Sequence, residues 1–226
     1  MQYANAAKPL IDLDKVCLRR DGGRTVLSDV CLRVRSGDFV AITGPNGGGK
    51  TTLLRIILRL LKPTSGTVEI APGLTIGYLP QKNAIDSHFP ISVTEVIESG
   101  LLAAKGLDKE QRDARVKSIL QLIEMENYAT HPIGRLSGGQ LQRTLFGRAI
   151  ISKPALLVLD EPLSYLDKKF EQHLYTIIAE LAKTATILLV SHEMSAISAM
   201  ATRHIIIDHT LHECSAAHHF IPTDCE

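Results

Sequence analysis

The chain has 226 residues, 45% of them hydrophobic, which suits one domain with a large core, with or without an insertion. Its 25 basic and 24 acidic residues leave a formal net charge of +1, which excludes a broad electrostatic field for nucleic acid or anionic lipid. It has no apolar run of about 18 residues that would span a membrane. The polar residues 1–8 do not form the apolar core of a signal peptide. Because the net charge is close to zero, any phosphate binding must depend on a local structure.

The first third of the chain predicts a small antiparallel sheet. Residues 10–18 and 26–34 alternate between apolar and polar side chains, and turn-forming residues follow at 21–23 and 36–38. Cys17 and Cys31 lie in these alternating runs, so we expect buried free thiols. The four cysteines include no close C-x-x-C pair, and a cytosolic, reducing location fits best.

Residues 39–43 form a short continuous apolar run, as expected for a buried parallel strand. A glycine-rich loop follows, and residues 51–61 then predict a mostly buried helix that ends before Pro63. A strand, a glycine loop and a helix are the context that a phosphate-binding loop requires. The loop consists of Gly44, Pro45, Asn46, Gly47, Gly48, Gly49, Lys50 and Thr51.

Each residue type in this loop has a chemical reason. Glycines let backbone N–H groups approach phosphate oxygens closely, and the helix N-terminus adds partial positive charge. Lys50 would reach the β- and γ-phosphates of a nucleoside triphosphate, and the Thr51 hydroxyl would bind Mg²⁺. Thr52 is a further candidate for phosphate contact. A glycine-rich turn without a ligand is the alternative interpretation.

The rest of the chain predicts an α/β core interrupted by helices. Residues 93–128 are charged and helical in period, and we interpret them as an inserted helical subdomain. Apolar runs at 155–159 and 186–190 predict further core strands, with an amphipathic helix at 168–182 between them. This βαβ order is typical of a parallel sheet.

Several motifs, in order, resemble those of the ATP-binding-cassette (ABC) ATPases over nearly the whole chain. Residues 136–140 (LSGGQ) resemble the family signature, and residues 156–162 (LLVLDEP) resemble the Walker B strand with its acidic end. The resemblance implies a P-loop NTPase of the ABC type, with a mixed parallel core sheet, a small N-terminal antiparallel β-subdomain and an inserted α-helical subdomain. We expect a single domain over 9–226: core 9–81 and 136–210, insertion 82–135 and C-terminal tail 211–226.

The resemblance also implies roles for individual residues. Asp160 would hold Mg²⁺ together with Thr51 and Gln81, the residue that resembles the Q-loop glutamine. Glu161 would be the general base that activates the attacking water. His192 resembles the switch histidine that contacts the γ-phosphate, and Asp167 belongs to a D-loop that touches the opposite subunit.

In this family the signature of one chain covers the ATP held by the other. The resemblance therefore implies an ATP-dependent homodimer in which Ser137, Gly138, Gly139 and Gln140 contact the partner's ATP. It also implies separate membrane permease subunits, an indirect link to a substrate-binding protein, and a peripheral position at the cytoplasmic side of the membrane. No nucleic-acid partner is expected. The alternatives are a non-transport ABC ATPase and a regulatory module that holds ATP without turnover.

Two segments are similar to cassettes of bacterial zinc and manganese uptake systems, residues 74–82 and 89–93. Phe89 and Pro90 are candidates for the groove that receives a membrane subunit, with local packing as the alternative. We also consider a zinc site in the C-terminal residues, against a polar solvated tail. Its candidate ligands are His204, His209, His212, Cys214, His218, His219 and Cys225.

One position departs from the family pattern. The family usually has an aromatic residue upstream of the loop that stacks on adenine, whereas residues 19–23 (RRDGG) contain none. Arg20 is the nearest candidate, because a planar guanidinium can stack on a base. The alternative is that Arg20 is a solvated charge at a strand end. Loss of an aromatic stack would cost about 1–3 kcal/mol.

Overall fold

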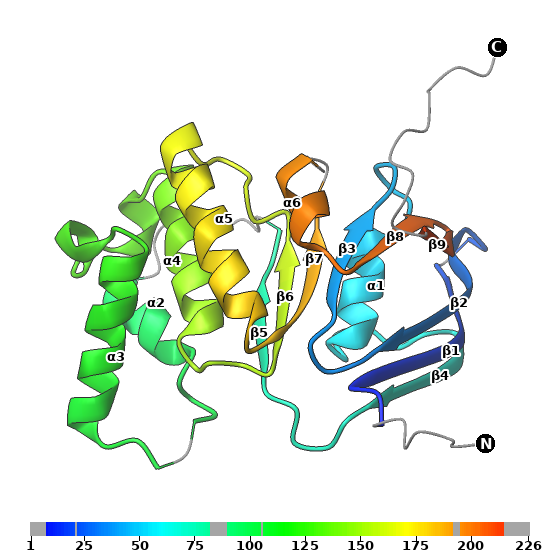
Figure 1. Ribbon diagram of the computed structural model, residues 1–226, viewed down its shortest axis with the longest axis horizontal. Coiled ribbons are helices and arrows are strands. Elements are labelled where there is room, and N and C mark those ends of the chain that lie inside the picture. Colours follow the sequence, from blue (N-terminus) through cyan, green and yellow to red (C-terminus); the bar gives the residue numbers. More distant parts are fainter. Residues whose placement is uncertain (1–7, 21, 82–89, 105, 192–194, 215–226) are drawn as a thin grey trace.

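The computed structural model describes residues 8–20, 22–81, 90–104, 106–191 and 195–214. It contains a six-stranded sheet in the order β5-β6-β7-β3-β8-β9 and a three-stranded sheet in the order β2-β1-β4 (Figure 1). The strands are β1 Ile11–Arg19, β2 Thr25–Val34, β3 Phe39–Thr43, β4 Ser65–Ile70, β5 Ile76–Leu79, β6 Leu156–Asp160, β7 Thr186–Val190, β8 Arg203–Asp208 and β9 Thr210–Cys214.

The six-stranded sheet is parallel from β5 to β8, and β9 pairs with β8 in the antiparallel direction. Its central strands β3, β6 and β7 are buried along nearly their whole length, as their continuous apolar runs predict. The second sheet is antiparallel throughout. The predicted α/β class, with a mixed parallel sheet and a small antiparallel sheet, is therefore confirmed.

Alternate residues of the main sheet face two separate cores. Val40, Val158 and Leu188 pack with the antiparallel sheet and with helix α1, which lies between the two sheets (Figure 1). Ala41 and Leu189 face the opposite core, which holds the other helices. The helices are α1 Lys50–Ile57, α2 Val93–Ser99, α3 Lys109–Leu122, α4 Gly138–Ile150, α5 Lys168–Ala182 and α6 Ser195–Met200, with 3₁₀ turns at Glu126–Tyr128 and Ile133–Arg135.

Helices α2 and α3 form the helical region that the sequence predicts between the two halves of the core. Both begin with a capping box, at Ser92 and at Asp108, so their first backbone N–H groups have side-chain partners. The region packs against α4 at Gly147, where an added Cβ would lie 2.9 Å from Ile119 and Ile123. This close approach joins the helical region to the helix that begins at residues 137–140.

Three expectations differ from the structure. Cys31 is exposed and Cys17 half-buried, because both lie on the outer face of the antiparallel sheet, where their thiols meet Asp14 and Asp29. The prediction of buried thiols is therefore wrong. Helix α1 ends at Ile57 rather than at residue 61, since the chain turns through Arg59 at a positive φ of 57°.

The core also extends further toward the C-terminus than the sequence predicts. Residues 211–214, assigned to a tail from the sequence, belong to β9 and pair with β8 from Leu211 to Cys214. The core sheet therefore extends at least to Cys214. Within the described part of the chain, every helix is too short or too polar to cross a lipid bilayer.

Candidate nucleotide site

The glycine loop connects β3 to α1 and depends on backbone conformations that favour glycine. Gly44, Gly47 and Gly49 have φ values of 137°, 82° and 105°. A Cβ at Gly44 would collide with the carbonyl oxygen of Ile207 in β8, and one at Gly49 would lie 2.9 Å from the carbonyl oxygen of Val26 in β2. The loop thus fits tightly between β8 and the antiparallel sheet.

Lys50 starts α1 and is only 6% exposed. Its ammonium Nζ donates to the carbonyl oxygens of Gly44 and Pro45, at 2.8 and 2.9 Å. Burial lowers the pKa of Lys50, while the charges of Glu161 and Asp160 act in the opposite direction. The lysine is therefore held inside the curve of the loop, facing the carboxylates at the end of β6.

Asp160 ends β6 and is completely buried. Neither of its carboxylate oxygens has a hydrogen-bond partner among the described residues. Burial raises the pKa of Asp160, and the nearby Thr51 hydroxyl and the Lys50 charge offset part of the rise. A buried carboxylate next to a threonine hydroxyl offers the hard oxygen ligands that Mg²⁺ prefers.

Glu161 follows directly, in a left-handed conformation with φ 53°. Its backbone N–H donates to Val190 at the end of β7, at 3.0 Å. The side-chain amide of Gln142 in α4 donates to its carbonyl oxygen and to that of Pro162, both at 3.3 Å. The turn that presents the Glu161 carboxylate is therefore fixed from the sheet and from α4.

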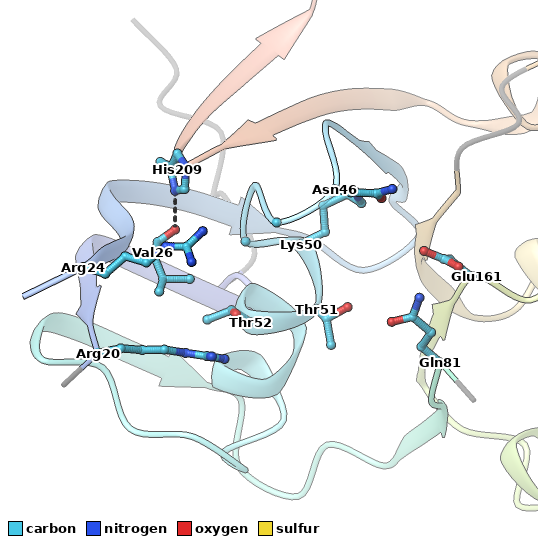
Figure 2. Close-up of a pocket in the computed structure, with 12 residues that line it drawn as sticks. Arg20, Arg24, Val26, Asn46, Lys50, Thr51, Thr52, Gln81, Glu161 and His209 are labelled. Carbon is cyan, nitrogen blue, oxygen red and sulfur yellow. Dashed lines mark hydrogen bonds between the residues drawn. The ribbon is translucent and has the colours of Figure 1, made fainter. Parts of the chain in front are cut away.

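These elements enclose a cavity of about 400 Å³, which we call the loop cavity (Figure 2). It is lined by Arg20, Arg24, Val26, Asn46, Gly47, Gly49, Lys50, Thr51, Thr52, Gln81, Glu161 and His209. Figure 2 shows Gln81 and Glu161 at one end and Arg24, Val26 and His209 at the other, with Lys50 and Thr51 between them. The two ends of the cavity therefore carry different side chains.

The structure thus gathers most of the residues predicted for nucleotide binding and catalysis. Gly44, Pro45 and Gly48 shape the loop without lining the cavity, and the buried Asp160 does not line it either. His192, Phe89, His218, His219 and Cys225 lie outside the described residues. Sequence reasoning missed Arg24 and placed His209 in a C-terminal histidine tract. His209 follows β8, which pairs with β3, so recognising that strand would have brought His209 to the edge of the loop.

The predicted signature residues form a second hollow of about 500 Å³, which we call the signature hollow. It is lined by Glu124, Met125, Tyr128, Ser137, Gly138, Gly139, Gln140, Arg143, Tyr165 and Asp167. No residue lines both the loop cavity and the signature hollow. The two sets of predicted nucleotide contacts therefore lie at separate places on one chain.

A capping box shapes the start of α4. The Ser137 hydroxyl accepts from the Gln140 N–H at 3.2 Å, and the Gln140 side chain accepts from the Ser137 N–H at 2.9 Å. Gly139 lets the helix approach Tyr165, whose carbonyl oxygen would lie 2.8 Å from an added Cβ. The signature and the D-loop therefore pack directly on each other.

Asp167 caps α5 by accepting from the Phe170 N–H at 2.9 Å, the contact that does most to lower the pKa of its carboxylate. The same carboxylate accepts from the Arg143 guanidinium at 2.9 Å. That guanidinium also lies 3.7 Å above the Phe170 ring. These contacts fix the D-loop to the signature helix.

The histidine tract is dispersed in the structure. His204 is buried in β8, His209 faces the loop cavity, and His212 contacts Thr210 in β9. No group of three or more His, Cys, Asp or Glu side chains that could hold a metal ion occurs among the described residues. Pro90, a candidate for the groove that receives a membrane subunit, is exposed and lies before α2.

Comparison with known proteins gives consistent matches. A family model described as ABC transporter matches residues 27–164. A zinc import ATP-binding protein of Pseudomonas syringae pv. syringae is 38% identical over 211 residues, covering 92% of this chain and 76% of that protein. A zinc uptake system ATP-binding protein of Listeria monocytogenes is 36% identical, with coverages of 91% and 88%.

A solved structure of a dimeric ATP-binding cassette, in a post-hydrolysis state with ADP and Pi, superposes with a TM-score of 0.82 at 27% identity. The match covers 92% of this chain and 99% of that one.

Proposed function

Because this chain belongs to the ABC transporter family and is an ATP-hydrolysing subunit of that family, we propose that it drives a metal-ion importer. Zinc or manganese is the proposed cargo. The observation that carries this proposal is the similarity to a zinc import ATP-binding protein over 92% of the chain.

We assign the phosphates of ATP to the part of the loop cavity that runs from Lys50 and Thr51 to Gln81 (Figure 2). The first turn of α1 has no side-chain cap, which leaves backbone N–H groups at Lys50, Thr51 and Thr52 for phosphate oxygens. Lys50 would exchange its bonds to the loop carbonyls for bonds to the β- and γ-phosphates. The triphosphate then replaces contacts that the loop makes with itself.

The buried carboxylate of Asp160, the Thr51 hydroxyl and the Gln81 amide would hold Mg²⁺ with the nucleotide. When bound, the ion neutralises charge on the β- and γ-phosphates. The influence of the Thr51 hydroxyl on the Asp160 pKa supports placing these two ligands on the same ion.

Glu161 is assigned as the general base. Its carboxylate lines the same end of the cavity as Gln81 and accepts a proton from the water that attacks the γ-phosphorus atom (Figure 2). The fixed backbone at Glu161 keeps the carboxylate aimed at this end. His192 is assigned by resemblance to contact the γ-phosphate.

A second copy of the chain completes the site. The loop cavity and the signature hollow are separate within one chain, so Ser137, Gly138, Gly139 and Gln140 would meet the nucleotide held by the partner. Asp167 and the rest of the D-loop would lie at the same dimer interface. Membrane permease subunits would bind the dimer, which would lie on the cytoplasmic side of the membrane. A substrate-binding protein would deliver the cargo to the permease subunits. We propose no nucleic-acid partner.

Transport by the assembled complex tests the cargo. The chain is co-purified with its permease and reconstituted in proteoliposomes with the substrate-binding protein and Mg-ATP. Uptake of Zn²⁺ and Mn²⁺ is then compared with uptake of Mg²⁺ and Ca²⁺. We expect uptake of Zn²⁺ or Mn²⁺ that disappears in the Glu161→Gln complex. ATP-driven uptake of another class of substrate, with no uptake of either metal, would contradict the proposal.

A further inference from the structure

The end of the loop cavity opposite Glu161 is built from basic side chains instead of an aromatic ring. Arg20, Arg24 and His209 line it together with Val26. Glu161 is the one acidic residue in the described lining, and Figure 2 places it at the other end. With the phosphates at the Glu161 end, the purine base would lie among these three side chains.

The β1–β2 turn holds the two arginines close to each other. The backbone N–H of Arg20 donates to the carbonyl oxygen of Arg24 at 3.0 Å. Both side chains are exposed, and neither guanidinium makes a hydrogen bond or ion pair within the described part of the chain. Both are therefore available to a ligand as hydrogen-bond donors.

His209 is fixed from three sides. Its backbone N–H donates to Gly48 at 2.8 Å, and its carbonyl oxygen accepts from the Ser28 N–H at 2.7 Å. Its ring Nδ1 lies 3.2 Å from the carbonyl oxygen of Val26, which can only accept, so Nδ1 carries the proton (Figure 2). In the neutral ring Nε2 is then an acceptor. It lies 3.9 Å from the Asp208 carboxylate, beyond hydrogen-bond distance.

We propose that Arg20, Arg24 and His209 form a purine-base site that accepts guanine at least as well as adenine, so that the chain hydrolyses GTP as well as ATP. Guanine presents two adjacent acceptors, N7 and O6, which match the paired donors of a guanidinium, whereas adenine presents an amino donor beside N7. The Nε2 acceptor of His209 matches the N–H groups of guanine. The second guanidinium can stack on the ring.

This inference rests on the proposed placement of the triphosphate, and rates with different nucleotides test it. We expect kcat/KM for Mg-GTP to equal or exceed that for Mg-ATP. For Mg-CTP we expect a value about 10-fold lower, because cytosine lacks the N7 and O6 edge. Arg24→Ala and Arg24→Lys should each lower kcat/KM for GTP roughly 10-fold relative to ATP, because lysine keeps the charge but loses the planar fork. The change should appear in KM, since the phosphate end is untouched.

Arg19→Ala is the matched control, since Arg19 is the exposed neighbour of Arg20 and does not line the cavity. It should leave the ratio of GTP to ATP unchanged. A wild-type preference for ATP over GTP of about 10-fold or more would overturn the inference. So would an unchanged ratio in Arg20→Ala and Arg24→Ala alike.

Equilibrium binding of fluorescent GDP and ADP analogues to the same proteins separates the two proposals. A chain that hydrolyses neither nucleotide would overturn the proposed motor function. The ratio of the two affinities would still decide the base site.

Discussion

Helices α1 and α4 both begin with residues predicted to contact nucleotide, yet they begin in different ways. Gly49 precedes α1 in a left-handed conformation and provides no side-chain cap. Ser137 precedes α4 and closes a capping box with Gln140. The first N–H groups of α1 are thus left for a ligand, whereas α4 satisfies part of its own first turn.

This difference suggests an order of events. At the loop cavity the first turn of α1 has no side-chain cap, so this region gains most from binding nucleotide within a single chain. At the signature hollow, Ser137 and Gln140 already hydrogen-bond each other, and Arg143 already binds Asp167. We expect nucleotide to bind the loop cavity first and the signature hollow of a second chain to close over it afterwards.

The largest expected effect is on catalysis in the loop cavity. Glu161→Gln removes the proton acceptor and should lower steady-state phosphate release by about 10²- to 10⁴-fold. ATP affinity should change little, because the loop and Lys50 are intact. Phosphate release and equilibrium ATP binding are measured on the same preparation. Turnover near the wild-type rate would show that another group is the base.

Alanine substitutions at two glycines of the loop distinguish the cost of a steric clash from the cost of an unfavourable φ. Gly44→Ala places a Cβ against the Ile207 carbonyl oxygen and should cost more than about 3 kcal/mol, abolishing ATP binding. Gly47→Ala meets open space and carries only the strain of φ 82°, about 1 kcal/mol. Denaturant unfolding and ATP titration compare the two. Equal losses would contradict the close packing of the loop on β8.

Asp160→Asn tests whether burying the Asp160 carboxylate lowers the stability of the fold. The folded-state pKa of Asp160 is raised by burial. Its contribution to stability is therefore full below the unfolded pKa of about 3.9 and is lost as the pH rises through the folded value. Since Asn cannot ionise, the variant should be more stable than wild type by roughly 1–3 kcal/mol at pH 8.

The stability gain of Asp160→Asn should shrink toward pH 4, and Mg-dependent hydrolysis should be lost. Thermal unfolding in EDTA without nucleotide measures the gain. A variant less stable than wild type at pH 8 would contradict the cost assigned to the buried carboxylate.

The smallest effect concerns the cap of α4. Ser137→Ala should cost about 1 kcal/mol of stability through the lost capping box and should also weaken ATP-dependent association. Ser92→Ala removes the equivalent cap of α2, which does not line the signature hollow, and should cost a similar amount without affecting association. Thermal unfolding and solution mass compare them. Equal association in both variants would separate Ser137 from the dimer interface.

The sequence predicts the parts of this structure that local patterns determine. Strands β3, β6 and β7 are continuous apolar runs, and α5 spans the predicted residues 168–182, because buried strands and amphipathic helices have strong periodic signals. Strand β4 was missed because its residues are mostly exposed, and it is defined by pairing with β1. Strand β5 pairs with β6 and β8 pairs with β3, both far away in the sequence, and β9 pairs with the neighbouring β8.

The residues of the loop cavity likewise divide into those in local motifs, which the sequence predicts, and those brought together by long-range pairing. The phosphate loop and the residues Asp160 and Glu161 are contiguous motifs at the ends of predicted strands. Arg24 and His209 meet in the loop cavity only because β8 pairs with β3 and its following turn hydrogen-bonds to Gly48 and Val26. No local pattern encodes that long-range contact.

The solution mass of Glu161→Gln with and without Mg-ATP tests most directly that each site is shared between two chains. With turnover blocked, the account predicts a monomer that doubles in mass when Mg-ATP is added, and no doubling when Ser137→Ala and Gly139→Ala are combined with it. A mass that stays monomeric in saturating Mg-ATP would contradict the account.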